Sequence, residues 1–152
     1  KPPSLYSSNY ALRLADGLII TSEDLITIPI QVKTTRGDNW PTRADYWIDI
    51  EINEKNKLQI DHGDKSISNP DLLYICVAIS NDGKDRFFIL KKAILQKICG
   101  LNYRKWMDTI NWKRPKNFQS LDNRYCISDL LQYEDNWILI EKEIEGKRPK
   151  NT

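Results

Sequence analysis

The chain has 152 residues, of which 40% are hydrophobic and 29% are charged, and its formal net charge is +2. This length and composition predict one globular domain, and they exclude a disordered chain, a fibrous repeat and a pair of domains of ordinary size. No apolar run approaches the roughly 18–20 residues that cross a bilayer, so we expect no membrane contact and a cytoplasmic location.

Apolar alternation predicts two strands near the N-terminus. Leu12 to Ile20 has the pattern of a strand that Asp16 and Gly17 interrupt. Residues 21–24 have the composition of a hairpin turn, and Ile26 to Thr35 alternates again as a second strand. We therefore expect an antiparallel pair, with a carboxylate at the interruption of the first strand.

The next segment combines a loop-like composition with a third alternating run. Residues 36–41 are rich in turn-forming residue types and are predicted to be a loop. From Tyr46 to Ile52 every second residue is apolar, which predicts a half-buried strand with Tyr46 directed inward and Trp47 outward. Residues 57–60 predict a short hairpin within a polar stretch.

The strongest apolar run of the chain lies at residues 72–79, and it predicts a strand that is covered on both faces. Residues 81–83 form a predicted turn, and residues 86–90 a further strand. Residues 91–99 are predicted to form a helix that ends at Gly100, because glycine is the residue type favoured at helix C-termini.

The C-terminal third is aromatic and basic. Residues 128–131 predict a short helical turn, and residues 136–140 predict a closing strand or helix. Together the elements predict an α/β or α+β fold in which helices flank a mixed central β-sheet. We assign residues 1–145 to this single domain and residues 146–152 to a basic, disordered tail.

Cysteine and histidine usage narrows the possible chemistry. Cys76, Cys99 and Cys126 are odd in number and lack a Cys-x-x-Cys spacing, which predicts reduced thiols in a cytosolic protein. His62 is the single histidine, and one histidine cannot build a zinc protease or zinc finger site. Because the sequence lacks a glycine-rich phosphate-binding motif, we expect no nucleotide cofactor.

Two polar side chains on the second predicted strand suggest phosphodiester chemistry. Residues two apart on a strand project to the same side, so Gln31 and Lys33 share one surface while Val32 anchors the strand in the core. Asp16, across the predicted hairpin, can reach the same point. Oxygen ligands beside an ammonium group are what a Mg²⁺-dependent phosphodiester hydrolase requires.

The segment Ile-Pro-Ile-Gln-Val-Lys-Thr-Thr at residues 28–35, preceded by Asp16, resembles the PD-(D/E)XK phosphodiesterases, the family of restriction endonucleases and Holliday-junction resolvases. The resemblance covers about residues 15–106. It implies a restriction endonuclease-like fold, DNA as the substrate and Mg²⁺, or Mn²⁺ in its place, as the cofactor. Apart from the resemblance, tryptophans exposed at the surface would suit a homodimer.

The resemblance also implies roles for individual residues. Asp16 would be the first metal ligand, Gln31 would stand at the second acidic position, and Val32 would contribute its backbone carbonyl to the metal. Lys33 would position or activate the attacking water. Asp24 is a rival for the first position, but it falls in the predicted turn.

The chain departs from the family pattern in three places. Asp16 is followed by glycine and lacks a preceding proline. At position 31 an amide replaces a carboxylate, which lowers the negative charge of the site and its affinity for Mg²⁺. The family's first helix, which often contributes a glutamate, has no counterpart after Lys1. The alternative function is therefore a catalytically inactive domain of this family that binds nucleic acid or a protein partner.

A basic and aromatic segment supplies the predicted DNA contacts. We expect phosphate contacts from its cations and base stacking from its indole ring. The candidate residues are Arg104, Lys105, Trp112, Lys113, Arg114 and Lys116. The competing interpretation is a solvated loop for the cations and core packing for the tryptophan.

Overall fold

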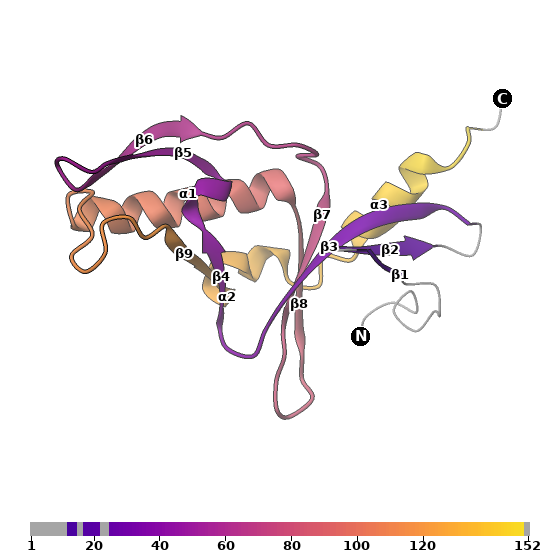
Figure 1. Cartoon of the computed structure of the whole chain (residues 1–152). Helices are drawn as coiled ribbons and strands as arrows, with labels where there is room; N and C mark the ends of the chain where they lie inside the picture. Colours follow the sequence, from indigo (N-terminus) through magenta and orange to yellow (C-terminus); the bar gives the residue numbers. More distant parts are fainter. Residues whose placement is uncertain (1–11, 15–16, 22–24, 151–152) are drawn as a thin grey trace.

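The structure is a computed structural model that describes residues 12–14, 17–21 and 25–150 (Figure 1). The described residues form a five-stranded sheet with the strand order β1-β2-β3-β7-β8. Neighbouring strands are antiparallel except for β3 and β7, which run parallel. The bounds are Leu12–Leu14 for β1, Gly17–Thr21 for β2, Thr27–Thr35 for β3, Leu73–Ala78 for β7 and Arg86–Lys91 for β8.

The first predicted strand is two strands in the structure. β1 and β2 pair with each other in antiparallel fashion, with Leu14 opposite Gly17. β2 then pairs with β3, which confirms the predicted antiparallel pair. Asp16, which precedes Gly17 in the sequence, lies outside the described residues.

β7 lies at the centre of the hydrophobic core. All of its residues are buried, so the strand is covered on both faces, as its apolar run predicted. Its side chains alternate between two core clusters. Tyr74 and Cys76 belong to the cluster on one face of the sheet, and Leu73 and Ile75 belong to the cluster on the other.

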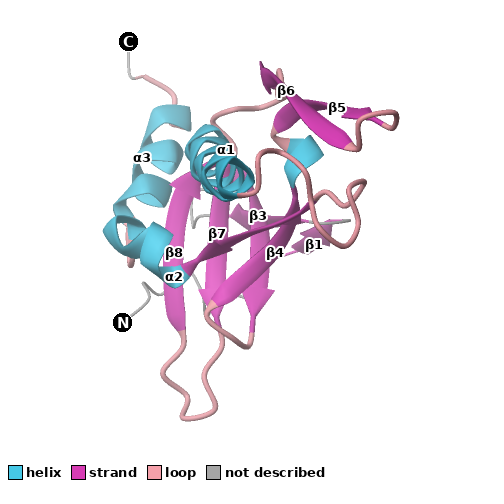
Figure 2. Cartoon of the chain, turned by 90° about the vertical axis from the view of Figure 1, so that its left-hand side faces the viewer, coloured by secondary structure: helices cyan, strands magenta, loops and turns pink. Residues whose placement is uncertain are grey.

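Helices cover both faces of this sheet (Figures 1 and 2). Leu95 of α1 belongs to the same core cluster as Tyr74, and Ile140 of α3 to the same cluster as Ile75. The fold is therefore mixed α+β, which confirms the predicted class. Among the described residues, no helix is long and apolar enough to cross a membrane. The helix bounds are Lys92–Thr109 for α1, Ile127–Leu130 for α2 and Ile138–Lys147 for α3.

Antiparallel ribbons pack beside the central sheet. They are β4 (Asn39–Arg43) with β9 (Asp122–Cys126), and β5 (Ile48–Asn53) with β6 (Leu58–Asp64). A hydrogen bond of 2.9 Å from the Asn123 side-chain amide to the Cys99 carbonyl joins β9 to α1. The β5–β6 ribbon lies alongside α1 (Figure 1).

β4 shows that the prediction of a loop over residues 36–41 is wrong for its second half. Trp40 stands opposite Tyr125 of β9, with ring centroids 5.3 Å apart and ring planes 8° apart. Both strands of a two-stranded ribbon are edge strands, which is where proline is tolerated, so Pro41 does not prevent the pairing. A stacked aromatic pair distant in sequence therefore overrides the loop-like composition.

The strand predicted from Tyr46 begins two residues later, because a 3-10 turn spans Ala44–Tyr46 and β5 starts at Ile48. The turn also makes the predicted directions wrong. Tyr46 is 59% exposed, whereas Trp47 is buried and donates its indole N–H to Thr42 Oγ1 at 3.0 Å. Alternation of residue types does not detect a turn that shifts the phase of the pattern.

The prediction that the first helix ends at Gly100 is wrong, because α1 continues to Thr109. Gly100 is buried where the β5–β6 ribbon approaches the helix. A Cβ atom there would lie 3.2 Å from Arg104 Nη1 and 3.9 Å from Ile48 Cγ1. This glycine therefore lies at a packed position within the helix and does not cap it.

α3 forms the closing element as a helix, which is one of the two predicted alternatives. It includes Gly146 and Lys147, the first two residues of the segment predicted to be a tail. Lys147 Nζ donates to the Thr27 carbonyl at 3.2 Å. The end of the helix is therefore joined to the start of β3.

Replacing Gly100 with leucine should lower the free energy of unfolding by about 1–3 kcal/mol, because the new side chain would be forced into the close contact between helix and ribbon. The matched control is Gly146→Ala in α3, where a Cβ would meet nothing within 4 Å. That change should raise stability by about 0.5–1 kcal/mol through helix propensity. Urea unfolding measures both, and a Gly100→Leu protein as stable as the parent would contradict the close approach.

Candidate functional site

β3 presents the candidate site on the side of the sheet that faces α1. Ile28 and Ile30 are buried in the cluster on the α3 side, and Val32 packs against that same cluster. Because side chains alternate along a strand, Gln31 and Lys33 project to the opposite side. The two polar side chains therefore share one surface.

The register of the sheet identifies the neighbours of Gln31. It stands opposite Gly17 in the antiparallel ladder and opposite Tyr74 in the parallel ladder. Gly17 directly follows Asp16 in the sequence. Asp16 and its rival Asp24 both lie outside the described residues, so the role of Asp16 stays a prediction.

The predicted metal ligands on β3 are oxygen atoms. They are the Gln31 side-chain amide and the Val32 carbonyl, since the Val32 side chain packs on the α3 side. The part of the chain that the structure describes has no group of three or more His, Cys, Asp or Glu side chains that could hold a metal ion. A Mg²⁺ site on β3 would therefore depend on the Asp16 carboxylate and on oxygen atoms of water or a phosphate.

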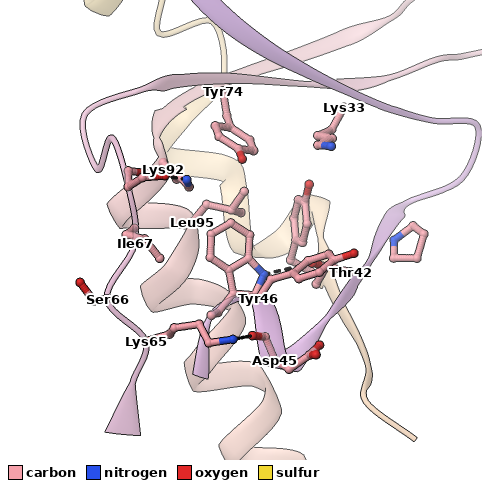
Figure 3. Close-up of a pocket in the computed structure, with 14 residues that line it drawn as sticks. Lys33, Thr42, Asp45, Tyr46, Lys65, Ser66, Ile67, Tyr74, Lys92 and Leu95 are labelled. Carbon is pink, nitrogen blue, oxygen red and sulfur yellow. Dashed lines mark hydrogen bonds between the residues drawn. The ribbon is translucent and has the colours of Figure 1, made fainter. Parts of the chain in front are cut away.

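Lys33 lines a pocket of about 710 Å³ on the α1 side of the sheet (Figure 3). Its walls come from β3, β4, the 3-10 turn, the segment after β6, β7, the first turn of α1 and β9. Gln31 does not line it. Figure 3 shows Lys33 and Lys92 entering the hollow from two sides. The polar lining includes Lys33, Thr42, Asp45, Lys65, Tyr74 and Lys92.

The lysines of the pocket retain donors for a ligand. Lys65 Nζ donates to the Asp45 backbone carbonyl at 2.7 Å, and Lys92 Nζ donates to the Ser68 carbonyl at 2.8 Å. Both acceptors are neutral. Within the described ranges, no hydrogen bond or ion pair engages the Lys33 ammonium group. Since an ammonium group has three N–H donors, each lysine can bind a further acceptor.

The Asp45 carboxylate offsets little of this positive charge. Arg43 donates to its two oxygens at 2.9 and 3.0 Å. That hydrogen-bonded pair holds the pKa of Asp45 below its usual value, so the carboxylate stays ionised and matched to Arg43. The pocket is therefore cationic.

The aromatic lining of the pocket contributes neutral groups. Burial raises the pKa of Tyr74 and of Tyr125, so both phenols remain protonated. The Cys76 sulfur lies 3.6 Å from the Tyr125 oxygen, and burial raises the pKa of this thiol to about 11. A thiol of that pKa is not a nucleophile at neutral pH. All of the chain's cysteines are described and are free, as predicted.

No family model, curated protein or solved structure matches the chain. The functional assignment therefore depends on the residue pattern of β3 and on the geometry of the site. Three observations support it: Gln31 and Lys33 project to the same side of β3, Gly17 pairs with Gln31, and Lys33 lines a cationic pocket.

Lys65, Lys92 and Tyr46 line the pocket, but the sequence analysis did not select them. A signal for Lys92 exists in the sequence, because it begins a helix whose first turn contains no acidic residue. Helix N-termini normally favour aspartate and glutamate. Lys65 and Tyr46 carry no comparable signal, since their role depends on which elements the fold brings beside them.

Arg104, a predicted DNA contact, is engaged by carboxylates within the fold. It donates to Asp61 at 2.6 Å and to Asp64 at 2.9 Å, which joins α1 to β6. The hydrogen bond with Arg104 lowers the pKa of Asp61. The adjacent Lys105 is exposed. The two neighbours therefore have different surroundings, although the sequence analysis grouped them.

Trp112, the predicted stacking residue, is half-buried at the end of α1. Its indole N–H donates to Asp108 Oδ1 at 2.8 Å, and its ring meets Tyr103 edge-on with centroids 6.3 Å apart. Trp112 also packs against the core cluster on the α1 side. These contacts fit the competing interpretation of core packing better than base stacking.

Arg114 is bound within the segment that follows α1. Its guanidinium donates to the Ser120 carbonyl at 2.8 Å and lies 4.5 Å from the centroid of the Trp106 ring. Lys113 and Lys116 are exposed. The predicted phosphate contacts of these two lysines and of Lys105 stay predictions, and all three side chains are accessible.

Arg104→Gln should lower the free energy of unfolding by about 1–2 kcal/mol, because it removes charged hydrogen bonds from two carboxylates. Lys105→Gln should change it by less than about 0.5 kcal/mol, since an exposed lysine is removed. Thermal unfolding of the two neighbouring variants makes a matched comparison. Equal stabilities would show that the Arg104 pair does not hold β6 to the helix.

The single histidine, His62, lies in β6 of the β5–β6 ribbon. His62 Nε2 lies 2.7 Å from Glu51 Oε2, and this hydrogen bond raises the pKa of His62. Because the folded pKa exceeds the unfolded one, the pair contributes its full stabilisation below the unfolded pKa of about 6.5. The contribution is lost as the pH rises through the folded pKa.

An NMR titration of His62 should therefore give a pKa above 6.5. Glu51→Gln should move it back toward the ordinary value, because the charged acceptor is lost. One histidine makes the resonance unambiguous. A pKa that is the same in parent and variant would contradict the pair.

Proposed function

We propose that the chain is a Mg²⁺-dependent endonuclease with a restriction endonuclease-like fold, which hydrolyses phosphodiester bonds in DNA. The observation that carries the proposal is the position of Lys33. Its ammonium group has no hydrogen bond or ion pair with the described residues. The Lys33 side chain projects to the same side of β3 as Gln31 and lines a cationic pocket. A phosphodiester is anionic, so such a pocket attracts it.

The strand arrangement supports this proposal. β2 and β3 form the antiparallel pair that the resemblance requires between the first aspartate and the Gln-x-Lys strand. Gly17, the residue after Asp16, stands opposite Gln31. Helices on both faces of a mixed sheet agree with the general architecture implied by the resemblance.

Each residue of the proposed centre has a separate role. Asp16, Gln31 and the Val32 carbonyl would hold Mg²⁺, which when bound supplies positive charge to the phosphate oxygens and lowers the pKa of water. Lys33 would orient the attacking water and donate to a phosphate oxygen. In the hydrolysis, the water oxygen bonds to phosphorus, the bond to one sugar oxygen breaks, and that oxygen takes up a proton.

The second candidate function is a catalytically inactive domain of the same fold that binds nucleic acid or a protein partner. Gln31 favours it, because a neutral amide does not offset the charge of Lys33 or of the metal ion. The same cationic pocket would then bind an anionic ligand without cleaving it.

Lys33→Ala should lower Mg²⁺-dependent nicking of a supercoiled plasmid by at least about 100-fold, because a group that stabilises the transition state is lost. Lys84→Ala is the matched control, since Lys84 is an exposed lysine of the turn between β7 and β8. Circular dichroism verifies the fold of both variants. Nicking by Lys33→Ala at the parent rate would reject the assignment.

Gln31→Glu should tighten Mg²⁺ binding in isothermal titration calorimetry, because a carboxylate adds negative charge to the ligand set. Asp16→Asn should weaken it for the opposite reason. Opposite shifts in the two variants would support a metal centre between these positions. Unchanged Mg²⁺ binding in both variants would contradict a metal site on β3 and favour the function of binding without cleavage.

A further inference from the structure

The N-terminal end of α1 carries charges of the sign that a helix disfavours there. Lys91 is its N-cap and Lys92 its first residue, and no acidic residue lies in the first turn. Lys91 pairs with Asp71 at 3.3 Å, whereas Lys92 lines the pocket and meets only the neutral carbonyl of Ser68 among its described hydrogen-bond partners. Since the helix dipole makes this end positive, an anion bound here would relieve the repulsion.

Two other elements direct ammonium groups toward the same hollow. Lys33 comes from β3 and Lys65 from the segment after β6, so with Lys92 the pocket is lined by lysines of three elements. Figure 3 shows Lys33 and Lys92 on two sides of the upper part of the pocket, and Lys65 lower down beside Asp45. The carboxylate of Asp45 is matched by Arg43 and does not neutralise them. Such a cluster on separate elements fits a phosphate group, which accepts hydrogen bonds in several directions.

An aromatic wall lies beside these cations. Tyr46 is 59% exposed and lines the pocket together with the buried side chains of Trp47 and Tyr125. The Arg43 guanidinium lies 5.8 Å from the centroid of the Tyr46 ring. Proteins that bind single-stranded nucleic acids combine an accessible aromatic ring with a cationic groove, because a base stacks on the ring while its phosphate pairs with the cations.

We propose that this pocket binds an unpaired nucleotide, with its phosphate at Lys33 and Lys92, its base against Tyr46, and Lys65 adding positive charge to the same pocket. The inference rests on the proposed function, since it names the kind of substrate that reaches Lys33. A pocket of about 710 Å³ has the size of a small-ligand site. A base inside a duplex is stacked and paired, so only an unpaired base can present its face to Tyr46.

The unpaired nucleotide could belong to a DNA strand or be a free mononucleotide, and one binding experiment separates the two. The probe is a fluorescein-labelled thymidine oligonucleotide of about eight nucleotides, a length within the usual range of single-strand sites. Its anisotropy is measured in EDTA, so that binding does not depend on metal or cleavage. Competition by thymidine monophosphate indicates a mononucleotide site, and competition by unlabelled oligonucleotide alone indicates a strand site. Either result supports the pocket.

Charge-reversal variants test the role of the lysines. Lys92→Glu should weaken oligonucleotide binding by more than about tenfold and reduce the salt dependence, by about 0.7 in slope for each phosphate that the variant no longer pairs. The same change should raise the thermal unfolding midpoint, because it places an acidic residue in the first turn of α1. Lys84→Glu is the matched control and should leave binding within about twofold of the parent. Lys65→Ala should weaken binding without raising the midpoint.

Tyr46→Ala tests the base. It should weaken binding of the oligonucleotide. The inhibition constant of inorganic pyrophosphate as a competitor should stay unchanged, because pyrophosphate has no base to stack. Binding of a duplex of the same length should be weaker than binding of the single strand. Equal binding of duplex and single strand, or equal affinities of Lys92→Glu and Lys84→Glu, would overturn the inference.

Failure of this inference and failure of the proposed function give different results. Plasmid nicking that depends on Lys33 but is unaffected by Lys92→Glu and Tyr46→Ala would overturn the nucleotide pocket and leave the endonuclease. Oligonucleotide binding that depends on Lys92 and Tyr46, with no nicking by the parent in Mg²⁺, would overturn the endonuclease and leave the pocket. Asp16→Asn should retain oligonucleotide binding in EDTA in either case.

Discussion

The burial of β7 on both faces is the constraint on which the rest of the structure depends. Every residue of this strand is buried, so each face needs an apolar cover and each edge needs a partner strand. α1 and α3 supply the covers, and β3 and β8 supply the partners. The position of β3 next to β7 follows from this requirement, and with it the direction of the polar side chains that β3 presents.

The same constraint produces the charge distribution of the pocket. α1 follows β8 directly and must lie on the sheet, so its N-terminal end with Lys92 comes near the side of β3 that carries Lys33. The segment after β6 adds Lys65 on a further wall. These like charges line one pocket because the elements that carry them are placed by apolar packing around β7. Local charge rules are often broken in this way at sites that bind a ligand.

β4 and α1 show that tertiary packing can override a local sequence pattern. The β4 segment has the composition of a loop, yet Trp40 becomes a strand residue because it stacks on Tyr125, which lies far away in the sequence. Gly100 has the identity of a helix terminator, yet α1 continues through it because Tyr103 and Met107, farther along the helix, are buried in the core. In both cases a tertiary contact outweighs a preference of about 1 kcal/mol per residue.

The sequence by itself determined the elements whose apolar pattern is strong. It predicted β7 from its continuous apolar run, β3 from its alternation, and the shared surface of Gln31 and Lys33 from the two-residue period of a strand. Only the tertiary structure decided that β4 pairs with β9, that Arg104 is held by carboxylates, and that Lys33 and Lys92 line the same pocket. The physical reason is range: a strand's period is encoded in adjacent residues, whereas the partners of a charge depend on elements that meet only after the core has formed.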